Sequence, residues 1–343
     1  MRFERVDLKE TRISWSAVSL AAFFHLGSVA AVCLLNWKSL LVFIFLHWLA
    51  GSLGVGIGYH RLLAHRSYKA PKLVEYFLTI CGTLAFERGP IYWVTTHRLH
   101  HAHADEEGDP HTPREGLWWA YMGWILSGKM HQHDAAALAQ YAPDLVKDRV
   151  HLWLDKFYYV PLIVLGIALF ALGGWPLVMS GVFLRVTLEW HFACLVNLAS
   201  HMWGRRRFAT KDDSYNTWWV ALLTFGEGWH NNHHAYPASA RHGLAWYEID
   251  INWWGIRVLE FLGLAKSIKV VRLLKETFPD RYHHLPHGRA LLAVWRTPRV
   301  YHDHLRLIDM DSGALNGTLG YGLEDHLSLG PSAPRTDIAG LGG

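Results

Sequence analysis

The sequence predicts an all-α integral membrane protein, with four transmembrane helices in two hairpins and a cytosolic helical cap that holds a His-rich dimetal site. Four apolar runs predict the spans; they cover residues 15–35, 40–59, 157–175 and 177–196. Each is about 20 residues long, enough for a helix to cross about 30 Å of hydrocarbon. Three histidine clusters in the polar segments that follow apolar runs predict the metal site.

The two hairpins are predicted from the shortness of the links 36–39 and 173–176. A fifth apolar run, 73–86, is too short to span comfortably and predicts a re-entrant or interfacial helix. The N-terminus and the segments 60–156 and 199–311 then lie on one face, which carries nearly all the Lys and Arg, while the opposite links carry only Lys38. Because positively charged loops stay inside, both termini and the histidine clusters are expected to be cytosolic.

Residues 1–311 are predicted to form one domain, and residues 312–343, rich in Gly, Ser and Pro, a disordered tail. Gly54 and Gly58 form a GxxxG pair, which predicts close packing of the second span against another helix. The three cysteines lie in apolar stretches and are interpreted as packing residues. The charged first 14 residues lack the apolar core of a signal peptide.

Composition narrows the class of function. The 343 residues include 24 His and 18 Trp, which suit metal or proton chemistry and membrane interfaces respectively. The net charge of +4 follows from the cytosolic bias of Lys and Arg. No basic stripe with interleaved aromatic residues is present in the sequence, which argues against nucleic acid as a partner.

The histidine clusters share a pattern. "HRLHH" holds His97, His100 and His101, and "HNNHH" holds His230, His233 and His234. In an H-x-x-H-H pattern on a helix, all three side chains share one face at metal-ligand spacing. The first cluster, "HRLLAH", places His60 and His65 five residues apart, so on an ideal α-helix they cannot share a face and are expected to straddle a helix end or a bend.

The number of imidazoles indicates more than one metal ion. Eight or more exceed the four to six ligands that saturate one ion, and imidazole binds Zn, Cu, Fe and Ni. The nearby carboxylates Asp105, Glu106, Glu107 and Asp109 are expected to orient the ligand imidazoles or to be solvated. Five histidines outside the pattern are interpreted separately: His103 and His111 as supporting or solvent-facing groups, and His283, His284 and His287 as part of a surface segment.

The segments "GYHRLLAHRSYKAP", "HRLHHAHADEEGDPHTP", "NLASHMWG" and "FGEGWHNNHHAYP" resemble the signature segments of the membrane fatty acyl desaturases, the family of stearoyl-CoA desaturase. The resemblance runs from about residue 15 to about residue 274. It implies two iron ions, O2 as co-substrate, and removal of two hydrogens from a long acyl chain to leave a cis double bond, here at Δ9. The implied metal-site residues are His60, His65, His97, His100, His101, Asn197, His201, His230, His233 and His234.

One departure from the animal members bears on the substrate. Thr95 and Thr96 stand where those enzymes carry Arg and Asp that contact coenzyme A, so the chain is more similar to bacterial, cyanobacterial and plant members, and a bacterial inner membrane is expected. The substrate can be either an acyl-CoA or an acyl-lipid, and membrane lipid is expected to surround the protein. Trp93, Thr95, Thr96 and Arg205 are the candidate substrate contacts. The neighbouring Arg206 and Arg207 could, with Arg205, hold a phosphate head group or a redox partner.

The sequence has no Gly-rich dinucleotide motif, haem-attachment motif or iron–sulfur cysteine set, so electrons are expected from an external donor. The resemblance implies ferredoxin, rubredoxin or cytochrome b5, with a reductase. Two alternatives stay open: a related di-iron membrane hydroxylase of lipids or alkanes, and a non-enzymatic membrane protein that binds metal.

Overall fold

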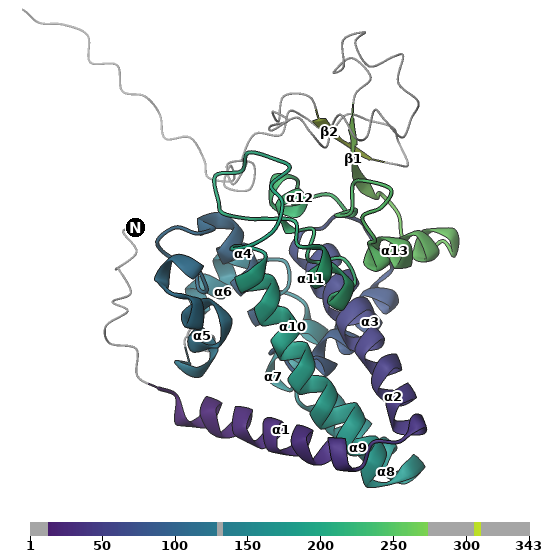
Figure 1. The fold of residues 1–343 in the computed structure, drawn as a ribbon. Helices are drawn as coiled ribbons and strands as arrows, with labels where there is room; N and C mark the ends of the chain where they lie inside the picture. Colours follow the sequence, from purple (N-terminus) through teal and green to yellow (C-terminus); the bar gives the residue numbers. More distant parts are fainter. Residues whose placement is uncertain (1–12, 129–132, 274–304, 310–343) are drawn as a thin grey trace, which may run out of the picture.

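The structure is a computed structural model that describes residues 13–128, 133–273 and 305–309 (Figure 1). The predicted tail 312–343 and the three histidines between 283 and 287 lie outside these residues. The first half contains α1 (Trp15–Cys33), α2 (Trp37–His47), η2 (Trp48–Ala64), α3 (Lys72–Leu84), α4 (Pro90–His103), η3 (Pro113–Glu115), η4 (Trp119–Gly123), α5 (Trp124–Leu126) and α6 (Ala135–Tyr141). The second half contains α7 (Arg149–Lys156), α8 (Val160–Gly173), α9 (Trp175–Val178), η6 (Met179–Leu184), α10 (Arg185–Ala199), α11 (Trp218–Leu223), α12 (His230–Ala235), α13 (Ile251–Phe261), β1 (Lys269–Leu273) and β2 (Leu305–Asp309).

Three stretches of helix are long and apolar enough to cross a membrane. They are α1, the continuous Trp37–Ala64, and the continuous Trp175–Ala199. A fourth crossing is possible if α7 and α8, bent by 66° at their junction, form one broken span. Leu26 of α1 and Leu172 of α8 are more than 70% exposed, as expected of side chains that face lipid. The chain is therefore a mostly helical membrane protein.

Local sequence explains the tight link between α1 and α2. The Asn36 side chain accepts hydrogen bonds from the backbone N–H groups of Lys38 and Ser39, and the Ser39 hydroxyl accepts one from the Asn36 N–H. This reciprocal cap starts α2 directly after α1. On the other link, Gly174 adopts a φ of +68°, in the left-handed region that favours glycine, and Pro176 follows at the start of α9.

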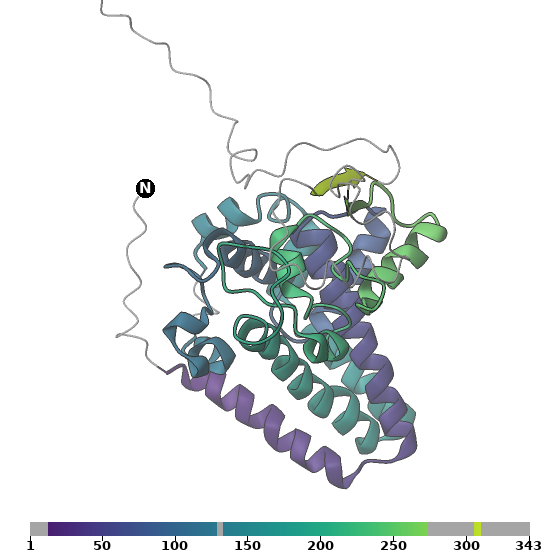
Figure 2. The ribbon, with the colours of Figure 1, turned by 45° about the horizontal axis from the view of Figure 1, so that its top comes forward.

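The apolar core has two main parts. One lies among the long helices and includes Phe24, Leu46, Leu169 and Val186. The other joins η2 and α3 to α4, α13 and β1, with Ile57 and Leu78 among its fully buried members. In Figures 1 and 2, α1 runs along the lower edge, whereas α11, α12 and α13 gather toward the opposite end. The histidine-bearing segments lie toward that opposite end.

Two sequence-based predictions need correction. The described chain is not wholly helical, because β1 and β2 form an antiparallel pair with Lys269 opposite Asp309.

The short run predicted at 73–86 is confirmed as the helix α3, which packs along η2. The GxxxG prediction of close packing is also confirmed, because a Cβ on Gly54 would lie 2.4 Å from the backbone of Cys81 and Gly82.

The second correction concerns His60 and His65. The spacing predicts that they cannot share a helix face, but η2 is wound as a π-helix, in which the backbone bonds close between residues five apart. The His65 N–H accordingly donates to the His60 carbonyl at 3.0 Å, and the two rings lie 4.9 Å apart. His65 directly follows the last helical residue, Ala64, as its C-cap, so the prediction that the pair straddles a helix end is confirmed.

Candidate metal centre

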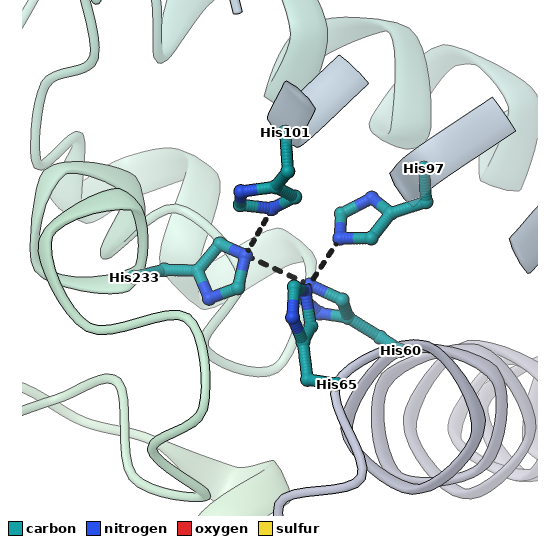
Figure 3. A group of neighbouring side chains, drawn as sticks. All are labelled: His60, His65, His97, His101 and His233. Carbon is teal, nitrogen blue, oxygen red and sulfur yellow. Dashed lines mark hydrogen bonds between the residues drawn. The ribbon is translucent and has the colours of Figure 1, made fainter. Parts of the chain in front are cut away.

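All nine predicted ligand histidines lie in two adjoining groups. Five of them form the first group (Figure 3): His60, His65, His97, His101 and His233. Their rings come from η2 and its end, from α4 and from α12. The Nε2 atom of His233 lies 3.0 Å from Nε2 of His60 and 2.8 Å from Nε2 of His101. Within the group, one nitrogen from each ring lies within 4.8 Å of one nitrogen from every other ring.

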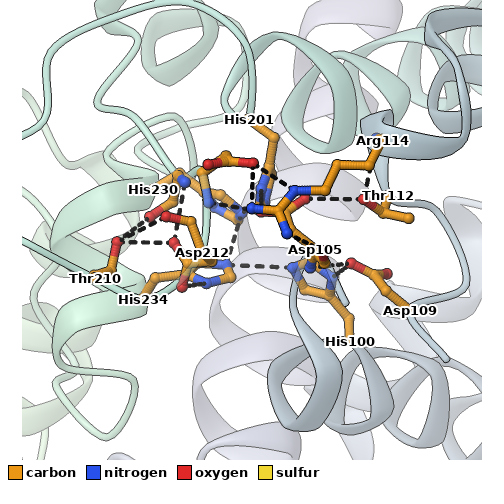
Figure 4. A network of polar contacts seen from close by, with 12 residues as sticks. His100, Asp105, Asp109, Thr112, Arg114, His201, Thr210, Asp212, His230 and His234 are labelled. Carbon is orange, nitrogen blue, oxygen red and sulfur yellow. Dashed lines mark hydrogen bonds and ion pairs between the residues drawn. The ribbon is translucent and has the colours of Figure 1, made fainter. Parts of the chain in front are cut away.

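The second group is fully buried and holds the other four histidines: His100, His201, His230 and His234 (Figure 4). The Nε2 atom of His230 lies 3.0 Å from Nε2 of His201 and 3.0 Å from Nε2 of His234. The His100 Nε2 atom lies 3.3 Å from that of His234. The His101 and His234 rings stack 4.5 Å apart, so the two groups share a boundary.

Each H-x-x-H-H helix serves both groups. On α4, His97 and His101 join the first group, while His100 joins the second. On α12 the division is reversed, with His233 in the first group and His230 and His234 in the second. Helical spacing therefore places neighbouring ligands on either side of the boundary between the groups.

Four of the nine imidazoles hydrogen-bond a carboxylate through Nδ1. The pairs are His60 with Glu227, His100 with Asp109 (3.0 Å), His201 with Asp105 (2.8 Å) and His234 with Asp212 (3.0 Å). An ionised carboxylate only accepts hydrogen bonds, so the imidazole nitrogen that faces it is the donor. The Nε2 atom of a neutral ring then presents a lone pair to its group.

The electrostatics favour ionised carboxylates and, at most of the histidines, neutral rings; at His100, Asp109 outweighs burial and raises the pKa of the imidazole. Burial and the neighbouring imidazoles lower the pKa values of the five remaining histidines: His65, His97, His101, His230 and His233. Burial by itself would raise the pKa of Asp109, but the adjoining His100 and His111 imidazoles outweigh it and lower that pKa. The site thus places these five neutral nitrogen donors close to buried, negatively charged carboxylates.

This donor chemistry fits a pair of divalent transition metal ions. The His100 and His234 Nε2 atoms lie 3.3 Å apart while the Nδ1 atom of each ring faces a carboxylate, an arrangement that a cation held between the two Nε2 atoms would satisfy. A carboxylate behind an imidazole is also the usual arrangement at metal sites, because it fixes the tautomer and the orientation of the ring. Nine nitrogen donors in groups of five and four match two ions.

Glu227, which no motif in the sequence singles out, is held by several partners besides His60. Arg61, fully buried, donates to its Oε1 atom at 3.1 Å, and the Asn252 amide donates to the same atom at 2.6 Å. Ser52 in turn donates to Asn252 at 2.7 Å. The chain of contacts ties η2 to α13 through the carboxylate that orients His60.

Other residues near the groups were also not anticipated. Asp212 lies outside the histidine segments, and its only sequence signal is that it precedes "HNNHH" by fewer than 20 residues. His242 is buried with its ring 4.4 Å from that of His233, and its Nδ1 atom lies 3.2 Å from Arg61. Among the anticipated carboxylates, Asp105 and Asp109 contact ligand rings, whereas Glu106 and Glu107 are exposed.

Arginines fasten the segments that carry the ligands. Arg98, between His97 and His100, donates to the Leu63 and Ala64 carbonyls at 2.6 and 2.8 Å and so closes the end of η2. Arg206 donates to the carbonyls of Thr210 and Asp212. Arg207 forms a two-pronged ion pair with Glu248. Arg206 therefore supports the chain around Asp212, and Arg207 fastens its own segment to Glu248.

A cavity that is partly open to solvent adjoins the metal groups. Asn197 lines it together with His60, His97, His100 and His230, while most other lining residues are apolar, such as Phe86, Trp190 and Phe192. Of the candidate substrate contacts, Trp93 and Thr96 line the cavity. Thr95 is fully buried outside the lining, and Arg205 is exposed, with its backbone paired to Asn216.

His103 and His111 lie beside the groups but outside them. His103 is half-buried at the end of α4. His111 is 6% exposed, lines the cavity, and packs its ring 4.5 Å from that of His100. Both positions agree with the interpretation of these residues as neighbours of the ligands.

Comparison with known proteins gives a consistent result. The family model described as "Fatty acid desaturase" matches residues 35–260. The chain is 44% identical over 258 residues to an sn-2 palmitoyl-lipid 9-desaturase of Nostoc sp. (strain 36), covering 75% of this chain and 90% of the relative. It is 44% identical over 261 residues to an sn-1 stearoyl-lipid 9-desaturase of Anabaena variabilis, covering 76% and 95%. It is 41% identical over 264 residues to Delta-9 acyl-lipid desaturase 2 of Arabidopsis thaliana, covering 77% and 85%.

Proposed function

The chain belongs to the fatty acid desaturase family, and we propose that it introduces a cis double bond at Δ9 of a long saturated acyl chain carried by a membrane lipid. The observation that carries this proposal is the junction of two groups of histidine donors with a largely apolar cavity. The lipid carrier is supported by the names of the relatives, which describe acyl-lipid substrates, and by Thr95 and Thr96 in place of coenzyme A contacts.

We propose that the nine histidines hold two iron ions and that Asn197 approaches one of them. When bound, the two irons would activate O2 so that hydrogen can be removed from unactivated methylenes, a reaction beyond any protein side chain. Desaturation consumes one O2, two electrons and two protons and yields the alkene and two waters. The chain itself orients the donors through Glu227, Asp105, Asp109 and Asp212.

The cavity positions the substrate and excludes water. Trp93 stacks its ring 5.1 Å from that of His97, so an acyl chain that passes Trp93 comes next to the first group. Apolar walls such as Phe86 and Trp190 bind methylenes without competing for the donors. A site of this kind holds its substrate in a reactive orientation and keeps water from the reaction.

We propose four membrane crossings, with α7 and α8 together as the third and the metal groups on the cytosolic side of a bacterial inner membrane. The support is the charge distribution, because the links 36–39 and 173–176 carry only Lys38 while the segments that follow η2 and α10 are rich in Lys and Arg. Electrons would reach this face from an external donor such as ferredoxin, rubredoxin or cytochrome b5 with a reductase.

Expression of the full chain in a bacterial host, followed by fatty acid analysis with double-bond mapping, tests the proposal. We expect new Δ9 cis-monounsaturated acyl groups in membrane lipids. Hydroxylated products without new double bonds would identify a hydroxylase instead, and an unchanged profile with bound metal would favour a metal-binding protein without this activity. Feeding acyl-CoA to isolated membranes and finding product as acyl-CoA first would contradict the lipid carrier.

A matched pair of variants tests the ligands. His100→Ala removes a donor of the second group, so we expect loss of desaturation and of bound iron while the protein stays in the membrane. His103→Ala, three residues along α4 and outside both groups, should keep both. Full activity of His100→Ala would refute the assignment.

A further inference from the structure

Two walls of the cavity meet at a buried polar contact. Along α10 the lining runs from Asn197, beside the metal groups, back to Glu189. Along η2 and α2 it runs from His60 back to His47. The residues farthest from the metal groups on these two walls contact each other, because His47 Nδ1 lies 3.3 Å from Glu189 Oε1. His47 and Glu189 therefore join these two walls at the level farthest from the metal groups.

Arg185 holds the Glu189 carboxylate in place. Its Nη1 atom donates to Glu189 Oε2 at 2.7 Å, and its Nε atom donates to the Gly181 carbonyl at 2.8 Å. The side chains of Arg185 and Glu189 are 0% and 3% exposed. The rings of Phe192 and Phe225 pack against His47 at 5.3 and 4.7 Å. The ion pair is thus sealed inside an otherwise apolar part of the molecule.

Burying two charged side chains inside an apolar helix costs free energy, which suggests that the pair has a function. Arg185 and Glu189 are the two charged residues of the apolar stretch Trp175–Ala199, one of the helices long enough to cross a membrane. A buried ion pair gains little net stability over apolar side chains of the same volume, and ionisable residues within membrane helices are commonly functional. Arg185 and Glu189 bond to each other, to Gly181 and to His47, and the two histidine groups of the described chain include neither residue, so metal binding does not account for the pair.

The depth of this contact matches the length of an acyl chain. Glu189 precedes Asn197 by eight residues on α10, which is about 12 Å along the helix axis. An extended hydrocarbon chain advances roughly 1.25 Å per carbon, given a C–C bond of about 1.52 Å. With its ninth carbon opposite Asn197, an eighteen-carbon acyl chain would reach roughly 11 Å further, to the level of Glu189.

We propose that His47, Glu189 and Arg185 form a polar floor that limits the length of the acyl chain on the methyl side of the new double bond. The proposal rests on the proposed function. A terminal methyl group can lie against the floor, but a longer chain would have to displace the ion pair without water or another charge to replace the broken contacts. The floor therefore sets an upper limit near eighteen carbons for a Δ9 reaction.

Two variants shift the floor in opposite directions. The double variant Arg185→Met with Glu189→Ala removes both charges together, so that neither is left buried and unpaired, and it opens space at the end of the cavity. Gly51→Leu adds bulk one turn above His47, where a Cβ would lie 3.2 Å from Phe225 and 3.6 Å from His47. Gly166→Ala on α8 is the control, because its Cβ would meet only Val182, at 3.8 Å, outside the cavity lining.

The experiment expresses each full-length form in a bacterial host supplied with sixteen-, eighteen- and twenty-carbon saturated fatty acids. Desaturated products of each length are quantified in total lipid, and protein in the membrane fraction is measured. We expect the double variant to raise the ratio of twenty- to eighteen-carbon products roughly tenfold, and Gly51→Leu to lower the ratio of eighteen- to sixteen-carbon products by a similar factor. Gly166→Ala should match the wild type.

The outcomes separate the two proposals. If the wild type makes no unsaturated product, desaturation itself is refuted. If the wild type desaturates but neither variant changes the chain-length ratios, the polar floor is refuted while desaturation stands. Gly51→Leu decides the matter alone if the double variant fails to accumulate in the membrane.

Discussion

The indole Nε1 of Trp93 donates a hydrogen bond to the Glu87 carboxyl group at 3.0 Å, in the wall of the cavity just before the first metal group. Burial raises the pKa of Glu87 to about 8, and the hydrogen bond from Trp93 only partly opposes that effect. The carboxyl group is therefore largely protonated at neutral pH. The cavity wall remains close to neutral at the point where a hydrocarbon chain would pass.

Glu87 should make stability fall as pH rises. An ordinary Glu has a pKa near 4.3 when unfolded, so between about pH 5 and pH 8 the folded state binds more protons than the unfolded state. We expect the wild type to lose at least about 1 kcal/mol of stability across this window. Glu87→Gln, which cannot ionise, should lack that component in thermal unfolding of the purified protein. An identical pH dependence in both forms would contradict the raised pKa.

Asp212 should matter for metal retention, whereas its neighbour Asp213 should not. Asp212→Asn replaces the ionised acceptor of the His234 Nδ1–H, and loss of such a partner typically costs 10- to 100-fold in metal affinity or activity. Asp213 pairs with Arg114 at the surface, so Asp213→Asn should change either quantity less than about twofold. Bound iron measured after dialysis against a chelator compares the two. Equal loss of iron from both variants would mean that the carboxylate at 212 does not act through His234.

Arg98→Lys should disturb the metal groups from a distance. A lysine cannot reproduce the planar set of donors that Arg98 directs to Leu63, Ala64 and Tyr141, so His65 at the end of η2 loses its support. We expect destabilisation of about 2 kcal/mol and reduced iron content. Arg66→Lys is the control, because Arg66 is 46% exposed and shares only the surface partner Asp144. Comparable effects of the two changes would show that the carbonyl contacts are unimportant.

Gly54→Ala tests the contact between η2 and α3. The added Cβ would lie 2.4 Å from backbone atoms of Cys81 and Gly82, which cannot move as a flexible side chain would. Crowding of this kind costs at least about 1–3 kcal/mol. Thermal unfolding should show the loss, while Gly166→Ala, with only Val182 nearby, should remain within about 0.5 kcal/mol of the wild type.

The predictions that succeeded depended on local spacing. The pattern H-x-x-H-H is a statement about one helix turn, and α4 and α12 place their histidines together as the pattern requires. The apolar runs likewise needed only length and composition, and three of them are helices long enough to cross a membrane. That there are four crossings stays a prediction, because the 66° bend between α7 and α8 depends on packing around it.

The predictions that failed depended on contacts between distant segments. His60 and His65 share a face because η2 winds as a π-helix, and helical periodicity assumes an α-helix. Glu227 reaches His60 across 167 residues, and Asn252 reaches Glu227 only because α13 folds back onto η2. No pattern in the sequence distinguishes Glu227 from other acidic residues. The pairing of β1 with β2 is also a long-range contact, between segments about 30 residues apart.

The division of consecutive histidines between the two groups would couple the loading of two metal ions. His100 and His101 sit next to each other on α4, and one serves each group. An ion bound by His101 therefore orders the same helix turn that presents His100, and the entropy of ordering that turn is lost only once. We expect metal to load cooperatively, so that a titration of the metal-free protein with ferrous iron passes from empty to doubly loaded molecules with few that hold a single ion.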